Sequence, residues 1–201
     1  LAHAKGLYKT EAEALKRALF CQNQGQHERA VAFFDACLAS EPANVTALAG
    51  KGESLRFLGR HADALPCFEG ALERNPSHAP TWFKKGVCLD HLKRFDEALV
   101  AFDRAIEHDP KSALSWNGRG LALGGLGRVE EAVAAFERAL AVDPRSPLPR
   151  LNIAEMLDRL GRLEEAARAY QQFLGVASPV LLAAQAQRAR ARLHELRGGA
   201  R

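Results

Sequence analysis

The sequence is short of aromatic residues and of long apolar stretches. Aromatic side chains make up 7% of the 201 residues, and there is one methionine. Residues 173–187 carry no charge, but Gly175, Pro179 and glutamines interrupt them, so they predict no membrane-crossing helix. The first ten residues hold histidine, lysine and tyrosine where a signal peptide needs an apolar run. We therefore expect a cytoplasmic protein that does not insert into a membrane.

Motifs for catalysis and metal binding are also missing. There is no GxxxxGK[ST] phosphate loop, no GxSxG nucleophile turn and no HExxH zinc motif. The four cysteines form no CxxC pair and fall on apolar helical faces, which favours buried thiols over a metal or redox site. These cysteines are Cys21, Cys37, Cys67 and Cys88. We expect no enzyme activity, no catalytic residue, no cofactor and no metal.

Basic charge is unevenly distributed along the chain. The net charge is +4, and residues 145–201 hold 10 basic and 5 acidic residues, so the excess lies there. A single-stranded nucleic-acid surface also needs aromatic rings for stacking. Apart from His194, the last aromatic rings are Tyr170 and Phe173. We therefore do not expect nucleic acid as a partner, and the basic segment is interpreted either as a solvated helix face or as a docking face for an acidic surface.

What the sequence does contain is a 34-residue repeat. Residues 95–110, FDEALVAFDRAIEHDP, return as residues 129–144, VEEAVAAFERALAVDP. Four columns recur at this period without a slip. They are Ala30, Ala64, Ala98, Ala132 and Ala166; Phe34, Phe68, Phe102, Phe136 and Tyr170; Gly52, Gly86 and Gly120; and Pro42, Pro76, Pro110 and Pro144. A fixed period of this size is typical of solenoid proteins.

The apolar spacing predicts two helices in each repeat. Small residues such as Gly86 let the paired backbones approach, and the ring of Phe102 is expected to fill the space beside them. Prolines end the second helix of each repeat, because proline cannot continue a helix. A left-handed residue is expected between the two helices, and lysine replaces glycine there in the third repeat. The five residues are Gly25, Gly59, Lys93, Gly127 and Gly161.

These features resemble the tetratricopeptide repeat family, including tryptophan at Trp82 and Trp116. The resemblance implies an all-α, right-handed α-solenoid of antiparallel helix pairs, with five repeats over residues 11–180. Residues 1–10 are then the tail of an incomplete preceding repeat, which predicts that the chain is the C-terminal piece of a longer array. Residues 181–201 are then a C-terminal capping helix and basic tail.

The fifth repeat and the cap depart from the pattern, as suits a terminal unit. Arg150 stands in the tryptophan column. Ser178 and Pro179 predict the start of a capping helix running from about residue 179 to 197. Its apolar stripe, expected to face the last repeat, is Leu182, Ala186, Ala189, Leu193 and Leu196. The arginines expected to lie mostly in water are Arg188, Arg190, Arg192 and Arg197.

In the family, the first helices of successive repeats line a concave groove that binds a peptide, a helix or a folded protein. The resemblance thus implies a scaffold or adaptor, and a folded signalling partner is open by family analogy. The alternative is a regulatory or substrate-docking arm of a larger multidomain enzyme or signalling protein, and self-association is also open. Family members that bind the C-terminal tails of chaperones hold the carboxylates with a lysine–asparagine pair and a lysine–arginine pair on two groove helices. At these positions the chain has only one matching residue, Lys84, so we do not expect that partner.

The groove helix of the fourth repeat is unusually rich in glycine. Gly118, Gly124 and Gly125 each cost up to about 1 kcal/mol relative to alanine in a helix interior. One interpretation is a notch for an anchor side chain of a partner, and the other is that neighbouring helices support the glycines without a function. The predicted partner-binding groove is Phe83, Lys84, Val87, His91, Leu114, Asn117, Gly118, Leu121, Gly125, Asn152 and Glu155.

Overall fold

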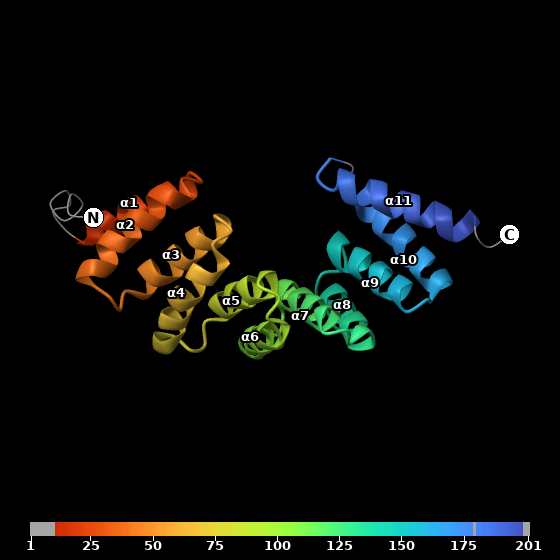
Figure 1. The fold of residues 1–201 in the computed structure, drawn as a ribbon, viewed down its shortest axis with the longest axis horizontal. Coiled ribbons are helices and arrows are strands. Elements are labelled where there is room, and N and C mark those ends of the chain that lie inside the picture. The colour runs from red at the N-terminus through yellow and green to blue at the C-terminus, as the bar shows by residue number, and fades with distance from the viewer. Residues whose placement is uncertain (1–10, 179, 199–201) are drawn as a thin grey trace. The chain divides into compact units, whose positions relative to one another are not determined.

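The computed structural model describes residues 11–178 and 180–198, which form helices and turns only. Residues 1–10, predicted as the tail of a preceding repeat, lie outside the described part. The helices are α1 (Glu11–Asn23), α2 (His27–Ser40), α3 (Val45–Phe57), α4 (His61–Arg74), α5 (Ala79–His91), α6 (Phe95–His108), α7 (Ala113–Gly125), α8 (Val129–Val142), α9 (Pro147–Arg159), α10 (Leu163–Val176) and α11 (Ala183–Gly198). Figure 1 shows them as successive helix pairs followed by α11, so the prediction of an all-α solenoid of helix pairs is confirmed.

The chain divides into two compact units, each with its own core. The first ends at His108 and contains α1 to α6, and the second begins at Asp109 and contains α7 to α11. Within each unit, a first helix packs against its paired second helix, and that second helix packs against the next first helix. Each unit therefore buries apolar surface by stacking pairs that could not bury both of their faces alone.

Phenylalanines of the second helices form the centre of both cores. The phenylalanine column is at most 1% exposed at Phe34, Phe68, Phe102 and Phe136. A Cβ atom on Gly86 would lie 2.8 Å from the ring of Phe102, and one on Gly120 would lie 2.5 Å from the ring of Phe136. Because only glycine leaves these rings their space, the expected pairing of glycine with phenylalanine is confirmed.

The turns inside the pairs have the expected left-handed backbone. Four glycines have φ between 70° and 78°, and Lys93 has φ 58°. The glycines are Gly25, Gly59, Gly127 and Gly161. Lysine therefore adopts the same turn as glycine at the end of α5, although its Cβ atom makes this conformation less favourable.

The residues of the tryptophan column join α5, α7 and α9 to the loops before them. The indole of Trp82 donates a hydrogen bond of 2.7 Å to the carbonyl of Pro76. Trp116 makes the equivalent bond, of 3.0 Å, to Pro110. Arg150, which replaces tryptophan in the fifth repeat, donates to the carbonyl of Pro144 instead. A guanidinium thus keeps the hydrogen bond that the indole makes elsewhere, which explains how the fifth repeat tolerates the change.

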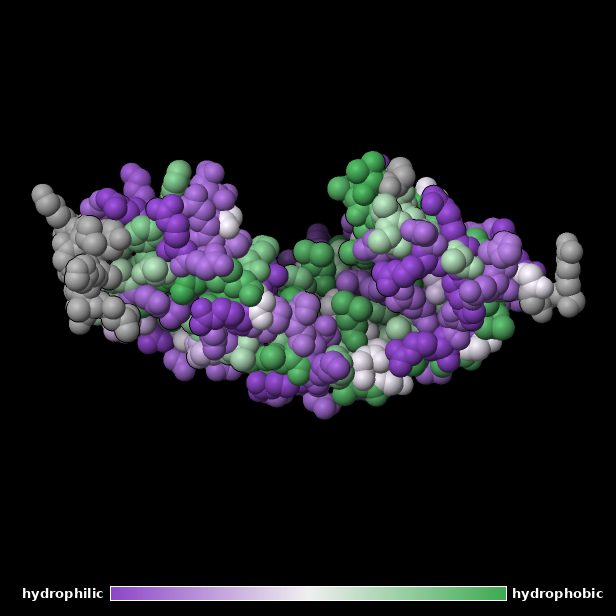
Figure 2. Space-filling model, turned by 45° about the horizontal axis from the view of Figure 1, so that its top comes forward, coloured by the Kyte–Doolittle hydropathy of each residue, from purple (hydrophilic) through white to green (hydrophobic). Residues whose placement is uncertain are grey.

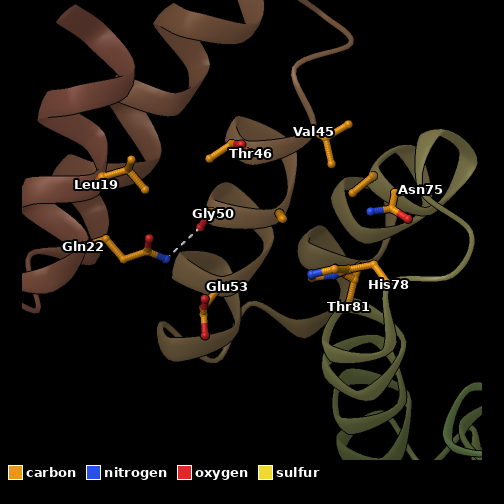
Figure 3. A pocket seen from close by; sticks show the side chains of 11 residues that line it. Leu19, Gln22, Val45, Thr46, Gly50, Glu53, Asn75, His78 and Thr81 are labelled. Carbon is orange, nitrogen blue, oxygen red and sulfur yellow. Dashed lines mark hydrogen bonds between the residues drawn. The ribbon is translucent and has the colours of Figure 1, made fainter. Parts of the chain in front are cut away.

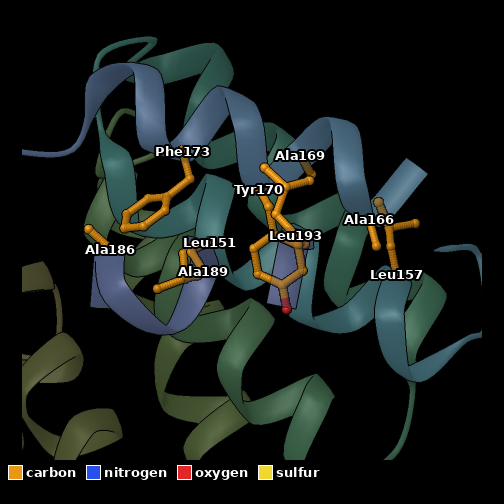
Figure 4. Packing of buried hydrophobic residues seen from close by; sticks show 10 residues of the cluster. Leu151, Leu157, Ala166, Ala169, Tyr170, Phe173, Ala186, Ala189 and Leu193 are labelled. Carbon is orange, nitrogen blue, oxygen red and sulfur yellow. The ribbon is translucent and has the colours of Figure 1, made fainter. Parts of the chain in front are cut away.

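The capping helix completes the core of the second unit. Ala186, Ala189 and Leu193 are buried, and Leu182 and Leu196 pack against the same cluster, so the predicted apolar stripe is confirmed. Figure 4 shows Ala186 and Ala189 beside Phe173, and Leu193 beside Tyr170.

The start of the cap differs from the prediction. Helix α11 begins at Ala183, not near residue 179. The Oγ atom of Ser178 accepts a hydrogen bond of 3.3 Å from the amide of Leu181, and its carbonyl accepts one from Leu182. Residues 180–182 thus form a turn before the regular helix, in which Ser178 accepts the same bond that a serine makes at a helix N-cap.

All four cysteines are buried and unpaired with one another, as the sequence predicts. Among the described residues, no cluster of histidine, cysteine, aspartate or glutamate has the arrangement of a metal site. None of the helices in the described part has the length and apolar character needed to span a membrane.

Candidate functional site

The first unit has a pocket of about 290 Å³ over α3, between α1 and the start of α5. Figure 3 shows Leu19 and Gln22 on one side of α3, and Asn75, His78 and Thr81 on the other. The lining residues come from four helices and the loop before α5. They are Leu19, Gln22, Val45, Thr46, Ala49, Gly50, Glu53, Ala71, Asn75, His78 and Thr81.

Small residues of α3 and α4 keep this pocket open. A Cβ atom on Gly50 would overlap the ring of Phe34, so the core of the first unit requires glycine at this position. Ala49 and Ala71 add only methyl groups to the lining. Gly50 is therefore required by the core, and the small side chains of Ala49 and Ala71 leave space in the pocket.

Hydrogen bonds fix several polar groups around the pocket. The side-chain amide of Gln22 donates a bond of 3.1 Å to the carbonyl of Gly50. Across α3, the Nδ1 atom of His78 and the Oγ1 atom of Thr81 lie 2.7 Å apart and share a hydrogen bond. The bond to Gly50 fixes the Gln22 amide by its nitrogen, and the oxygen of an amide is a hydrogen-bond acceptor.

One residue that lines the pocket, Glu53, belongs to an ion pair. The Nζ atom of Lys84 lies 2.6 Å from the carboxylate of Glu53, and both side chains are 27% exposed. Arg56 lies 3.9 Å from the same carboxylate. Lys84, predicted as part of the groove rim, is therefore already neutralised by a neighbouring first helix, and the pair joins α3 to α5.

The other predicted residues of α5 also contact neighbouring side chains. The ring of Phe83 lies 5.9 Å from that of Phe102, and the two planes are tilted by 51°. The ring of His91 stacks on that of His61 at 4.3 Å. Val87 is partly buried. This part of the predicted groove is thus held in place by the packing of α5 within the first unit.

The predicted residues of α7 and α9 lie in the second unit. Leu114 and Leu121 are exposed large apolar side chains, 66% and 42% exposed. The amide of Asn152 donates a hydrogen bond of 2.9 Å to the side-chain oxygen of Asn117. Figure 2 shows such apolar residues in green among the mostly polar, purple surface. An exposed apolar surface with an amide pair between its helices is suited to contact a polypeptide.

Glu155 of α9 is exposed, yet the atoms around its carboxyl raise its pKa by excluding water. Arg188 of α11 acts in the opposite direction and lowers it. Burial and an opposite charge therefore compete at this carboxyl, and burial is the stronger of the two.

The glycines of α7 have different surroundings. A Cβ atom on Gly124 would lie 3.2 Å from the sulfur of Met156, and the Gly124 carbonyl accepts a long hydrogen bond from Arg159. Gly124 therefore makes room for α9, which corrects the interpretation that it leaves an open notch. Gly118 is buried, and Gly125 is exposed at the end of the helix.

One arginine of the capping helix is not turned mostly to water. The guanidinium of Arg192 makes two hydrogen bonds of 2.7 Å to the two carboxylate oxygens of Asp158 in α9. These bonds are the main cause that lowers the pKa of Asp158. The expectation for Arg192 is therefore wrong, because an acid one repeat earlier lies within its reach. Arg188, Arg190 and Arg197 are exposed.

The sequence analysis missed the pocket of the first unit. Glu53 and Leu19 stand 34 and 68 residues before Val87, so they occupy the same groove column as a predicted residue. Applying the repeat period to the predicted groove would have named them. What the period does not reveal is the depth, which depends on Gly50 and the ring of Phe34 beneath it.

Comparisons with known proteins agree with this architecture. Family models described as tetratricopeptide repeat match residues 50–113, 94–147, 117–180 and 14–44. Similar solved structures include MamA 41-end from Desulfovibrio magneticus RS-1, with a TM-score of 0.79 and 21% identity, covering 85% of this chain and 97% of that one. TTC0263, a thermophilic repeat protein of Thermus thermophilus, has a TM-score of 0.71 and 25% identity, and the match covers 92% of this chain and 99% of that one. No curated protein sequence matches the chain.

A third similar structure is YrrB, described as having an unusual peptide-binding site. Its TM-score is 0.73 and its identity 22%, and the match covers 89% of this chain and 90% of that one. At this level of identity, the likeness concerns the fold.

Proposed function

Because the chain belongs to the tetratricopeptide repeat family, we propose that it is a non-enzymatic scaffold or adaptor that binds a protein or peptide partner on the surface of its first helices. The observation that carries the proposal is the pocket over α3, which is lined by small, apolar and polar residues of four helices and one loop. Its mixture of apolar walls and a few fixed polar groups is the usual composition of a site for a polypeptide side chain.

An extended peptide is the partner form that fits this surface. Leu19 and Val45 offer apolar contact to a side chain, while the side-chain oxygen of Gln22 and the hydroxyl of Thr46 can bond to peptide amides. The Glu53–Lys84 pair leaves little net charge at this end of the pocket. We therefore expect an apolar anchor residue, and no requirement for a carboxylate terminus. The peptide-binding site of YrrB, on a similar fold, supports the same class of ligand.

The proposal keeps the exposed surface of α7 and α9 as a second contact region. Leu114, Leu121 and the Asn117–Asn152 pair are its main features. The proposal also places the protein in the cytoplasm, where unpaired thiols such as the four buried cysteines stay reduced.

The first test selects peptides from a random displayed library on the whole chain and measures them by calorimetric titration. Ala49→Leu fills the pocket from its floor, and we expect it to weaken the best peptide by roughly tenfold or more, the size of a lost anchor contact. Ala62→Leu is the matched control, because Ala62 is an exposed alanine of a second helix, α4. If the wild type, Ala49→Leu and Ala62→Leu bind the peptide equally, the pocket is not the binding site. If no peptide can be selected, peptide binding itself is contradicted.

A further inference from the structure

Aromatic rings stack at two equivalent joints between repeats of the first unit. The ring of His27, at the start of α2, lies 4.7 Å from that of Phe57 at the end of α3, with 7° between the planes. One period later, the ring of His61, at the start of α4, lies 4.3 Å from that of His91 at the end of α5, with 4° between the planes. The geometry is the same, but only the second joint has two rings that can take up protons.

The His61 ring has poor surroundings for a positive charge. Its Nδ1 atom is buried and has no hydrogen-bond partner among the described residues. A protonated imidazole has two N–H donors, so the cation would leave one of them unsatisfied. Burial is the main cause that lowers the pKa of His61 below 6.5, and His91 and Arg56 lower it further.

The charged groups of the neighbouring helices do not offset this effect. Arg56 of α3 adds a positive charge near His61. Asp90 of α5 interacts with His91, whose charge lowers the pKa of this carboxyl while burial raises it. Two other acids have partners already: Glu53 pairs with Lys84, and Asp63 pairs with Arg60. A positive charge on His91 is therefore attracted by Asp90, whereas a positive charge on His61 is repelled by Arg56.

We propose that the His61–His91 stack is a proton-sensitive joint, in which protonation of His61 against the stacked ring of His91 loosens the packing of α5 on α4 at mildly acidic pH. Two like charges in parallel rings repel, and Arg56 adds a third. The joint itself does not depend on the proposed function. Its effect on a partner does rest on that function, because Lys84 of α5 pairs with Glu53, which lines the pocket.

The direction of the pH dependence follows from the protons bound by each state. With the pKa of His61 lowered in the folded protein, the unfolded chain binds protons first as the pH falls through about 6.5. The stack therefore contributes its full stability above pH 6.5 and loses it below that value, until the lowered pKa of the folded protein is passed.

The test measures hydrogen exchange of the α5 amides in the whole chain at pH 7.5 and 5.5, corrected for the intrinsic exchange rates. We expect protection in the wild type to fall on acidification by roughly tenfold for each unit by which the pKa is lowered. His91→Phe copies the natural His27–Phe57 joint, so it is expected to fold and to lose the part of this dependence that comes from the charge on His91. A nuclear magnetic resonance titration of the His61 ring gives a second readout, in which His91→Phe raises the midpoint.

The control is His27→Phe, which alters the other joint and is expected to keep the wild-type dependence of α5. If His91→Phe does not fold, His61→Phe removes the same pair of charges from the opposite helix. The proposal is overturned if wild-type α5 shows no loss of protection between the two pH values. It is equally overturned if His91→Phe loses as much protection as the wild type, or if its His61 titrates unchanged.

Discussion

At the scale of single residues, the glycine columns carry most of the information about packing. Gly86 and Gly120 leave space for a phenylalanine ring of the paired helix, and Gly50 leaves space for Phe34 of the preceding one. Gly124 differs, because its neighbour is the flexible side chain of Met156. Glycines that look alike in the sequence therefore tolerate substitution differently.

Gly120→Ala is expected to destabilise the protein by about 1–3 kcal/mol, because the new methyl group would lie 2.5 Å from a buried phenylalanine ring that cannot move aside. Gly124→Ala is the matched comparison on the same helix. It is expected to be close to neutral or stabilising, since Met156 can adjust and alanine favours the helix. Urea denaturation of the two variants measures the difference, and equal losses would contradict this account of the glycines.

Lys93→Gly is expected to stabilise the protein by up to about 1 kcal/mol. Lys93 has φ 58°, a conformation that is unfavourable for a residue with a Cβ atom, and the four equivalent turns have glycine. The greater freedom of glycine in the unfolded chain offsets part of this gain. Thermal unfolding measures the change. Lys93→Ala keeps the Cβ atom and is the control, and a gain of the same size for alanine would show that the backbone conformation is not the cause.

At the scale of secondary-structure elements, side chains one repeat apart join the first helices to each other. Lys84 bonds to Glu53 between α5 and α3, and Asn152 bonds to Asn117 between α9 and α7. These bonds lie on the surface proposed for binding. Substitutions there are therefore expected to change the spacing of the helices as well as contacts to a partner.

The bond between Arg192 and Asp158 gives a pH prediction for the second unit. Because this bond lowers the pKa of Asp158 below 3.8, its contribution is present above that value and is lost as the pH falls through the lowered pKa. We expect Asp158→Asn to cost about 1 kcal/mol at pH 7, given a partly exposed ion pair, and almost nothing at pH 2.

Urea denaturation at the two pH values measures this loss. Glu195→Gln is the control, because Glu195 also bonds to Arg192 but is 63% exposed on the same helix. A constant difference between the wild type and Asp158→Asn at both pH values would mean that the ion pair does not stabilise the contact of α11 with α9.

At the scale of the whole molecule, stability is expected to be local. The contacts within each unit join helices that are adjacent or next but one in the chain, as in other stacked-repeat proteins. Gly86→Ala, which crowds Phe102, is therefore expected to increase amide exchange in α5 and α6 much more than in α10 and α11. Hydrogen exchange by mass spectrometry checks this pattern. A uniform increase along the chain would instead indicate one cooperative unfolding unit.

The sequence by itself determined the helix pairs, the left-handed turns and the packing of glycine against phenylalanine. These features depend on local backbone preferences and on side-chain size, and the 34-residue period repeats both signals. It also placed the apolar stripe of the capping helix, although it put the start near Pro179, four residues before Ala183. The helix begins later because Ser178 takes part in a turn. A serine at this place in the sequence is compatible with a turn as well as with a helix cap.

The tertiary structure alone decided which side chains meet between repeats. The sequence analysis placed Lys84 in the predicted groove without a partner from its own chain, expected Arg192 to lie mostly in water, and found no pocket near Ala49. Each of these outcomes depends on distances between side chains about 30 residues apart, which the repeat period does not specify. The stack of His61 on His91 has the same origin, because the period relates His61 to His27 and His91 to Phe57, and only the packing of α5 on α4 brings the two histidine rings within 4.3 Å.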